Sequence, residues 1–282
     1  MKNQMVGGLA MLVAFSGLSQ STVIRSYEKQ YQAQAKDFTL VVDNVSGEVE
    51  VEGYDGNTIL LNLKIRVNGK PSEIEKAKTE LTLGEYSSEG LLLLTMKAPF
   101  VDEKLEDGRM KWRSINHGPD YDYWYDFSLK VPRNTNLELR TVNDGDILVR
   151  DVRGMLKTNN VNGHIEIELA NEVEKAETVN GDVNVSYAIN PEFPGVFSTV
   201  NGDVVLRMQR QLNADFQAQT MNGEMYTDFE IVRIFPQGKV KVSRRGSGTM
   251  YHINDKTNLR IGEGGPDFEL GTLNGDIYLK KI

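Results

Sequence analysis

The chain has 282 residues, with 32 Lys and Arg against 40 Asp and Glu, three His and no Cys. The net charge of −8 argues against nucleic acid as the main partner, because phosphate binding needs an excess of Lys and Arg. The lack of Cys excludes disulfides, thiolate zinc sites and Cys nucleophiles, and we expect no cofactor. A hydrophobic fraction of 39% and a mean hydropathy of −0.40 are typical of a folded chain without multiple membrane spans.

Residues 1–20 have the features of a secretory signal peptide. Lys2 precedes an apolar run from Met5 to Leu18, and small residues follow that run. A buried N-terminal helix is the alternative, and two adjacent glycines within the run count against it. The run is too short for a transmembrane helix, which needs about 20 apolar residues. We therefore predict that the mature chain is extracytoplasmic, in the periplasm, at the cell surface or secreted, and that it does not span the membrane.

Residues 21–135 are predicted to form a β-rich capping region. Apolar and polar residues alternate around Phe38 to Val42 and again from Leu61 to Val67, which is the two-residue period of a half-buried strand. Such a region would protect the edges of the following strands from pairing with other chains. We therefore expect this part to cover one end of the remaining fold.

One short helix is predicted within this region, near residues 72–81. Ser72 and Glu75 have the spacing of a capping box at its start. The charged stretch from Pro99 to Pro119 shows little apolar periodicity and is predicted to be an exposed loop.

A predicted strand after this loop carries four aromatic residues that are candidate binding residues. Alternation places Tyr121, Tyr123 and Tyr125 on one face and Trp124 on the other. Flat aromatic side chains at a surface form stacking platforms for sugars. The alternative is a half-buried strand whose aromatic residues belong to the core.

From residue 136 to the end at 282, one short phrase recurs. It reads TVNDGDI (141–147), NVNGHI (160–165), TVNGDV (178–183 and 199–204), TMNGEM (220–225) and TLNGDI (272–277). Its glycines are Gly145, Gly163, Gly181, Gly202, Gly223 and Gly275, in steps of 18, 18, 21, 21 and 52 residues. A weaker copy, NVSGEV, occupies residues 44–49. Self-similarity at a period near 20 residues is typical of stacked-repeat folds.

The repeats predict an all-β fold, a single-stranded β-solenoid of β-helix or β-roll type with repeats of about 18–21 residues over 136–282. Asn-Gly favours turns in which φ is positive, and a series of ordinary β-hairpins is the alternative. In a stack, the Thr and Asn of successive copies would each form a column, with amides hydrogen-bonded along it. The predicted turn residues are Asn162, Gly163, Asn180, Gly181, Asn201, Gly202, Asn222, Gly223, Asn274 and Gly275.

An acidic residue follows the glycine in most copies, as in Asp182, Asp203 and Asp276. These carboxylates could align in a column that holds calcium. The nine-residue GGxGxD repeat of dedicated calcium-binding stacks is absent, which favours solvated acids at turns. We predict no metal site.

The sequence resembles a bacterial domain-of-unknown-function family known as putative adhesins or β-strand-repeat proteins. The resemblance rests on FSLKVPRNTNLELRTVNDGDILVRDVRGMLKTNNVNGHI (127–165) and IGEGGPDFELGTLNGDIYLKK (261–281), and it covers most of the chain after residue 20. It implies a β-solenoid or β-roll in the cell envelope and favours a binding role without identifying the ligand.

No local motif for catalysis is recognisable: GxSxG, HExxH and phosphate-binding glycine loops are all absent from the sequence. We therefore predict a non-enzymatic, exported cell-envelope protein that acts as an adhesin, a binding module or a scaffold. A periplasmic structural or envelope-stress protein and a β-solenoid enzyme acting on polysaccharide are the alternatives. The expected partner is a surface glycan or an envelope protein, and the sequence does not choose between them.

Overall fold

The structure is a computed structural model that describes residues 21–33, 37–106, 109–114, 118–236, 241–245, 248–252 and 256–282. Within residues 102–117 and 234–255 it describes only backbone structure. The signal peptide predicted over residues 1–20 lies outside the described residues. The described part is built from β-strands and one helix, which confirms the predicted all-β class.

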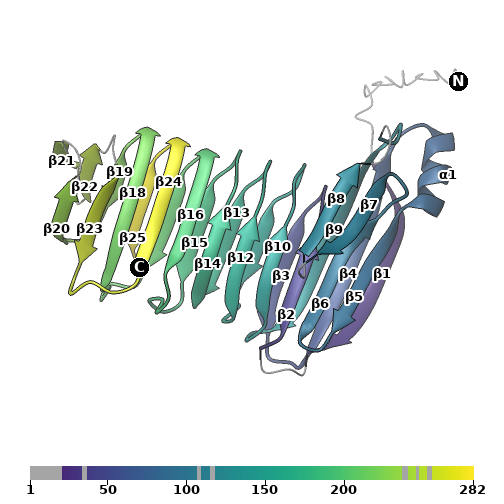
Figure 1. Cartoon of the computed structure of the whole chain (residues 1–282), viewed down its shortest axis with the longest axis horizontal. Helices are drawn as coiled ribbons and strands as arrows, with labels where there is room; N and C mark the ends of the chain where they lie inside the picture. Colours follow the sequence, from purple (N-terminus) through teal and green to yellow (C-terminus); the bar gives the residue numbers. More distant parts are fainter. Residues whose placement is uncertain are drawn as a thin grey trace, which may run out of the picture.

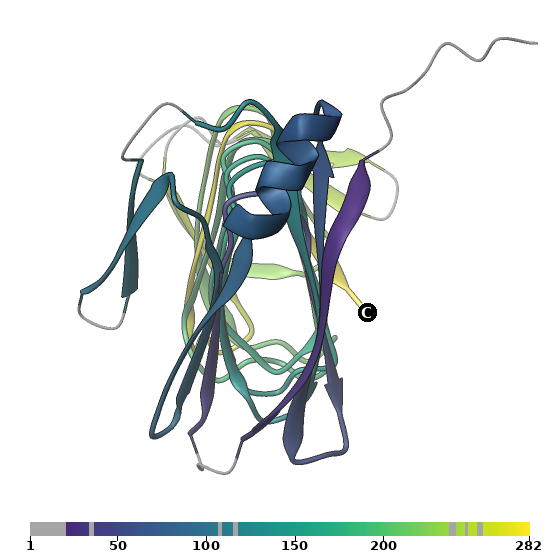
Figure 2. The same ribbon diagram turned by 90° about the vertical axis from the view of Figure 1, so that its right-hand side faces the viewer.

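Two large sheets face each other along the length of the molecule (Figures 1 and 2). In the described part, the first sheet has the order β1 (Thr22–Gln32), β4 (Thr58–Asn68), β9 (Asp122–Pro132), β3 (Val49–Tyr54), β11 (Ile147–Arg150), β13 (Ile165–Ala170), β15 (Val183–Tyr187), β17 (Val204–Met208), β25 (Ile277–Lys281), β19 (Met225–Thr227), β22 (Gly248–His252) and β21 (Lys241–Arg245). The second sheet has the order β20 (Ile231–Pro236), β23 (Thr257–Ile261), β18 (Ala214–Asn222), β24 (Asp267–Asn274), β16 (Gly195–Asn201), β14 (Glu172–Glu177), β12 (Met155–Asn159), β10 (Asn136–Arg140), β2 (Thr39–Asp43), β6 (Leu91–Lys97) and β5 (Thr82–Ser88).

The chain alternates between the two sheets in units of two strands, one strand from each sheet. Neighbouring units pair in parallel, as β10 does with β12 and β11 with β13. The recurring phrase forms the turn that links the two strands of a unit. The units are β2–β3, β10–β11, β12–β13, β14–β15, β16–β17, β24–β25 and β18–β19.

The N-terminal region continues both sheets. Strands β2 and β3, which flank the weak NVSGEV copy, pair in parallel with β10 and β11. Strands β9, β4 and β1 extend the first sheet from there, and β6 and β5 extend the second. The helix α1 (Pro71–Glu80) lies over this end of the molecule (Figure 2).

Two local predictions in this region are wrong. Helix α1 begins after Lys70, which makes no side-chain capping hydrogen bond, so Ser72 and Glu75 do not form the predicted capping box. Pro71 at the first helical position supplies the fixed φ that starts the helix. The predicted loop between Pro99 and Pro119 contains the antiparallel pair β7 (Val101–Glu106) and β8 (Arg109–Ser114). The two-residue alternation of these strands could not be recognised in the sequence, because the segment is highly charged and has few apolar residues.

The core lies between the two sheets and follows the two-residue period of the strands. Inward side chains such as Ile147, Ile165 and Val183 are fully buried, and the residues between them face solvent. In the second sheet, Phe268 lies between Phe197 and Phe216, at ring-centroid distances of 6.4 and 5.3 Å. Each unit therefore buries its apolar face against its neighbours as well as against the opposite sheet.

The C-terminal unit occupies a place in the stack that its position in the chain does not predict. Strands β24 and β25 lie between β16–β17 on one side and β18–β19 on the other. Thr272 is paired with both Thr199 and Thr220. The copy at 272–277 therefore stacks between the copies at 199–204 and 220–225, although it follows both of them in the chain. Three nearly identical turn phrases make this insertion compatible with one register.

We expect Tyr187→Phe to raise the free energy of unfolding by about 1 kcal/mol, because the Tyr187 hydroxyl is buried and no described residue pairs with it. Tyr125→Phe is the matched control. The Tyr125 hydroxyl donates to the carbonyl oxygens of Thr82 and Lys97 at 3.2 and 3.3 Å, so its removal should cost about 1 kcal/mol. Urea unfolding of both variants measures the two changes. Equal destabilisation would contradict the conclusion that the buried Tyr187 hydroxyl has no described hydrogen-bond partner.

Candidate functional site

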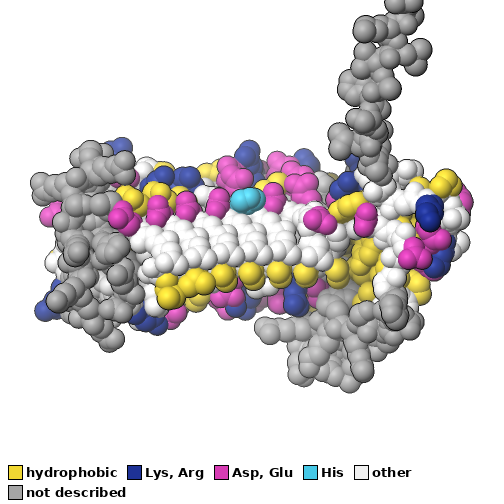
Figure 3. Space-filling view, turned by 90° about the horizontal axis from the view of Figure 1, so that it is seen from above, with side chains coloured by type: hydrophobic (Ala, Val, Ile, Leu, Met, Phe, Trp, Pro, Cys, Tyr) yellow, Lys and Arg dark blue, Asp and Glu magenta, His cyan; other side chains and the backbone are white. Residues whose placement is uncertain are grey.

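The turns that carry the repeated phrase line up into a long flat surface, which we call the ladder face. It consists of the turns of the units from β10–β11 to β18–β19, in register at about the 4.8 Å spacing of strands. Figure 3 shows this face from above, with an uncoloured band between a hydrophobic stripe and an acidic stripe.

The first residue of the phrase, usually Thr, links neighbouring turns by a buried hydrogen bond. Each Thr is buried, and its hydroxyl donates to the carbonyl oxygen of the glycine in the adjacent turn, at 2.8 to 3.0 Å. Asn160 replaces Thr in its copy, and its Nδ2 donates to the Gly145 oxygen at 2.9 Å. The residues of this row are Thr141, Asn160, Thr178, Thr199, Thr272 and Thr220.

The Asn residues form an exposed amide row. In each step, the Nδ2 of one side chain donates to the Oδ1 of the next, at 2.7 to 3.1 Å. Each amide has a second N–H besides the one that can be used in the row, and the side chains are exposed, so the row offers polar groups at a regular spacing. The order of this row is Asn143, Asn162, Asn180, Asn201, Asn274 and Asn222.

The glycines of the phrase form a further row, and glycine is required there because neighbouring turns pack closely. A Cβ on Gly181 would lie 2.2 Å from the backbone oxygen of Gly163, and one on Gly223 would lie 1.9 Å from that of Gly275. Gly223 carries no positive φ, yet it meets the same obstruction. The close approach of backbones therefore requires glycine at positions that were predicted from turn geometry alone.

The residues after the glycines form an acid row. One carboxylate oxygen of each Asp accepts the backbone N–H of the corresponding residue in the next unit, at 2.7 to 2.9 Å. His164 takes one place in this row, and its Nδ1 accepts the N–H of Asp182 at 2.9 Å. The row is Asp146, His164, Asp182, Asp203, Asp276 and Glu224.

An apolar row runs along the other side of the amides. It is formed by the residues between Thr and Asn of the phrase. In the four units β14–β15, β16–β17, β24–β25 and β18–β19, these side chains are exposed by 37 to 61%. A surface that is apolar, polar and acidic in parallel strips can contact a long ligand at many equivalent points. The apolar row is Val142, Val161, Val179, Val200, Leu273 and Met221.

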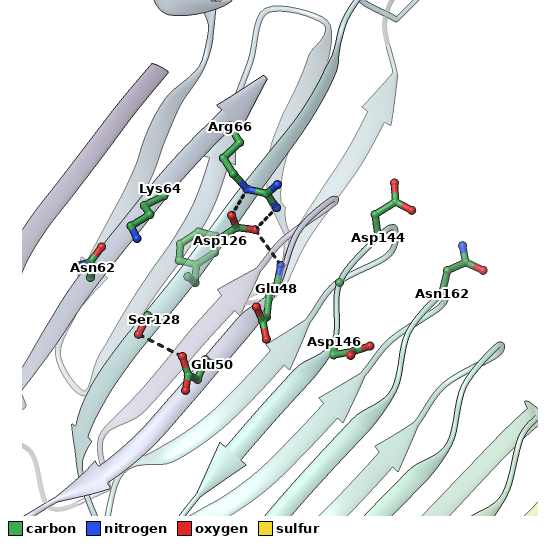
Figure 4. Close-up of a pocket in the computed structure, with 12 residues that line it drawn as sticks. Glu48, Glu50, Asn62, Lys64, Arg66, Asp126, Ser128, Asp144, Asp146 and Asn162 are labelled. Carbon is green, nitrogen blue, oxygen red and sulfur yellow. Dashed lines mark hydrogen bonds and ion pairs between the residues drawn. The ribbon is translucent and has the colours of Figure 1, made fainter. Parts of the chain in front are cut away.

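The acid row ends in a groove of about 710 Å³ on the outer face of the first sheet, where the ladder face meets β3, β9 and β4 (Figure 4). The carboxylates of Glu48, Glu50 and Asp146 lie in it. Asn62, Lys64 and Ser128 also line it. The sequence analysis missed this groove, because strands far apart in the sequence build it.

Arg66 and Asp126 form a bidentate ion pair at this end of the row. The guanidinium Nε and Nη2 of Arg66 donate to the two carboxylate oxygens of Asp126, the latter at 3.0 Å. The Arg66 guanidinium also lies 5.2 Å from the Trp124 ring. Partial burial, together with the charges of Glu50 and Asp126, raises the pKa of Glu48. The nearby carboxylates of Glu50, Asp126 and Asp146 add to this shift and make the groove acidic.

Two tyrosines stand beside the acid row at the opposite end of the stack. The rings of Tyr226 and Tyr278 are stacked with centroids 5.0 Å apart. The Tyr278 hydroxyl donates to Asp276 at 3.0 Å and that of Tyr226 to Glu224 at 2.9 Å. Partial burial and the bond to Asp276 raise the pKa of Tyr278 to about 12. The hydroxyls thus help to fix these carboxylates in place.

Of the predicted aromatic residues, Tyr123, Trp124 and Tyr125 lie on β9, and Tyr121 directly precedes it. Tyr121 and Tyr125 are buried among core residues, and Tyr123 is half-buried with its ring 5.5 Å from that of Phe100. Only Trp124 points outward, toward Arg66. A sugar-binding role for these four residues stays a prediction, with Trp124 as the member nearest the groove.

Among the described residues, no three His, Asp or Glu side chains gather in a group that could hold a metal ion. The same part of the chain contains no helix that is both long and apolar enough to cross a membrane.

No protein-family model matches the chain, and no curated protein matches it. Similar solved structures include a putative cell adhesion protein from Clostridium sporogenes, with 12% identity, a TM-score of 0.43 and coverage of 92% of this chain and 100% of that one. They also include two Parabacteroides distasonis proteins with 9% identity. One is a putative lipid binding protein, with a TM-score of 0.24 and coverage of 91% of this chain and 96% of that one. The other is a putative adhesin, with a TM-score of 0.25 and coverage of 92% and 97%.

Proposed function

We propose that this chain is an exported β-solenoid that binds a linear polymer of the cell envelope along its ladder face and has no catalytic role. The observation that carries the proposal is the alignment of apolar, amide and acid rows over successive units. A ligand with a short repeat can make the same contacts at each unit, so that weak individual contacts add up along the stack.

The rigidity of the face supports a binding role. The Thr, amide and acid rows are held by hydrogen bonds between units, so these polar side chains are ordered before any ligand binds. A surface that is already ordered loses little conformational entropy on binding. An extended polysaccharide suits such a surface, because its sugar rings present an apolar face and polar edges together.

The double substitution Val179→Ser and Val200→Ser tests this proposal. Both side chains are exposed on the apolar row, so their loss should leave folding intact and lower polymer affinity about 10-fold. Val232→Ser is the matched control, since Val232 is 65% exposed on β20, outside the ladder face. Co-sedimentation with a panel of insoluble polysaccharides measures the effect. Equal binding by both variants would show that the ladder face is not the binding surface.

The location of the protein is tested separately. We expect an epitope-tagged chain to be cleaved by a protease added to intact cells, as an adhesin at the cell surface would be. Protection until the cells are lysed would favour a structural role inside the envelope and would remove the adhesin interpretation.

A further inference from the structure

Part of the acid row carries charge that no described Lys or Arg neutralises. Asp146, Asp203 and Asp276 form no ion pair with a described Lys or Arg. Neighbouring carboxylates lie about one strand spacing apart, a distance at which like charges repel. The row is therefore a line of negative potential along the ladder face.

Some of the other charges on the same sheet are paired. Glu52 on β3 lies 3.1 Å from Lys130, and Glu168 on β13 forms an ion pair with Arg150. These pairs lie four residues farther along the strands than the acid row, as the register of β11 with β3 and β13 shows. The acid row is distinct from these pairs, and Glu50 and Glu166 on the same sheet, which form no ion pair with a described Lys or Arg, add to the negative charge beside it.

The apolar and amide rows restrict what the acid row can bind. They lie beside it at the same spacing, so one ligand unit per protein unit would touch an apolar side chain, an amide and a carboxylate. We propose that the ladder face binds a linear polysaccharide whose sugars carry free amino groups. This proposal rests on the proposed function and specifies the chemical class of its ligand.

The spacing of the rows favours such a polymer over a basic peptide. An extended peptide places side chains of one face about 6.6 Å apart, and the rows repeat at about 4.8 Å. An extended β-linked sugar chain advances by about the length of one sugar ring for each residue, and this length is comparable to one strand spacing. Successive sugars of such a chain are turned over relative to each other, so the protonated amines on one edge can meet every second carboxylate, while the ring faces pack on the apolar row.

The groove at the end of the row is also acidic. Arg66 is held by Asp126, and the lining has more carboxylates than the two cationic side chains, Lys64 and Arg66. The polymer is therefore expected to occupy the face from Asp146 toward Glu224 and to be able to continue into the groove.

His164 provides a test in which affinity increases. Its Nδ1 accepts the N–H of Asp182, as the Oδ1 of Asp182 accepts that of Asp203. An aspartate at this position can make the same hydrogen bond and would complete the line of carboxylates. We expect His164→Asp to bind chitosan, a polymer of glucosamine, about threefold more tightly.

The opposite change uses Asp182→Asn and Asp203→Asn. An amide oxygen can still accept the N–H of the next unit, so the substitutions remove charge and keep the hydrogen bonds. We expect about a 10-fold loss of chitosan affinity for the double variant, and weaker binding at higher salt. Glu269→Gln is the control: it removes an exposed charge from β24 on the outer face of the second sheet and should change affinity little.

Binding is measured with chitosan and with its fully N-acetylated form, at a pH where both the amines and the carboxylates are charged. The proposal is overturned if both polymers bind equally, or if the acid-row variants bind chitosan as the unaltered chain does. In that result, continued sensitivity to Val179→Ser and Val200→Ser would leave the proposed function standing. Equally tight binding of polylysine, with the same dependence on Asp182 and Asp203, would overturn the assignment to a polysaccharide. Absence of chitosan binding would overturn it as well.

Discussion

Gly181→Ala is expected to lower the free energy of unfolding by about 3 kcal/mol. The added Cβ would lie 2.2 Å from the backbone oxygen of Gly163 and 2.6 Å from its carbonyl carbon, so the two units must separate. Backbone cannot move aside as the end of a side chain can, and forced overpacking of a tight interior costs about 1–3 kcal/mol. Separation would also weaken the hydrogen bond from the Thr178 hydroxyl to the Gly163 oxygen. Thermal or urea unfolding measures the loss.

Gly271→Ala is the matched control for this substitution. Gly271 lies on β24, and a Cβ there would meet only the Ser198 Cβ at 3.8 Å, which is ordinary van der Waals contact. We expect its free energy of unfolding to stay within about 0.5 kcal/mol of the unaltered chain. Similar losses at both positions would mean that the close packing of turns is not what requires glycine at position 181.

The double variant N201C/N274C is expected to form a disulfide rapidly in the folded protein. Asn201 and Asn274 are register partners in parallel strands, and their side chains are 2.7 Å apart. A separation near one strand spacing lies within the range that a disulfide spans. The loop it closes would raise stability by up to about 4 kcal/mol. Because the chain has no Cys, the new pair is the only one that can form.

The variant N201C/N222C tests the same feature from the other side. The unit β24–β25 separates these two residues, so their Cα atoms should be about two strand spacings apart, too far for a disulfide. Oxidation followed by gel electrophoresis distinguishes the cross-linked forms. Rapid cross-linking of this pair in the folded protein would show that the units stack in chain order and that the C-terminal unit lies outside.

The repeats predict much of this fold because each copy contains the local sequence signals for its own strands and turn. Alternating apolar residues identify the strands, and the phrase around Asn180 or Asn201 identifies the turns. The amide row follows from those turns once neighbouring units are in register, and the structure adds Asn143 to its end. The place of the unit after Gly264 could not be predicted, since its turn phrase fits equally well beside two other copies.

The candidate site is predictable only in part, for a related reason. The acid row can be read from the phrase, but whether its carboxylates have cationic neighbours depends on which strands lie beside it. The groove at its end combines Arg66, Asp126 and Asp146, which belong to strands and turns distant in sequence. Trp124 and Tyr123 show the limit of alternation, which assigns faces to residues but does not tell which face is covered.

The insertion of the C-terminal unit also has a kinetic consequence. The strands of β16–β17 find their partner on one side only when residues 267–281 have been synthesised, and that pairing closes a loop of about 70 residues. Long-range parallel pairing is slow compared with the pairing of adjacent units. The units from β2–β3 to β16–β17 can therefore assemble first and wait with an unsatisfied edge. Arrival of the late unit fills that edge and aligns β18–β19 behind it, which makes this step the one where a nascent chain is most open to mispairing with another copy.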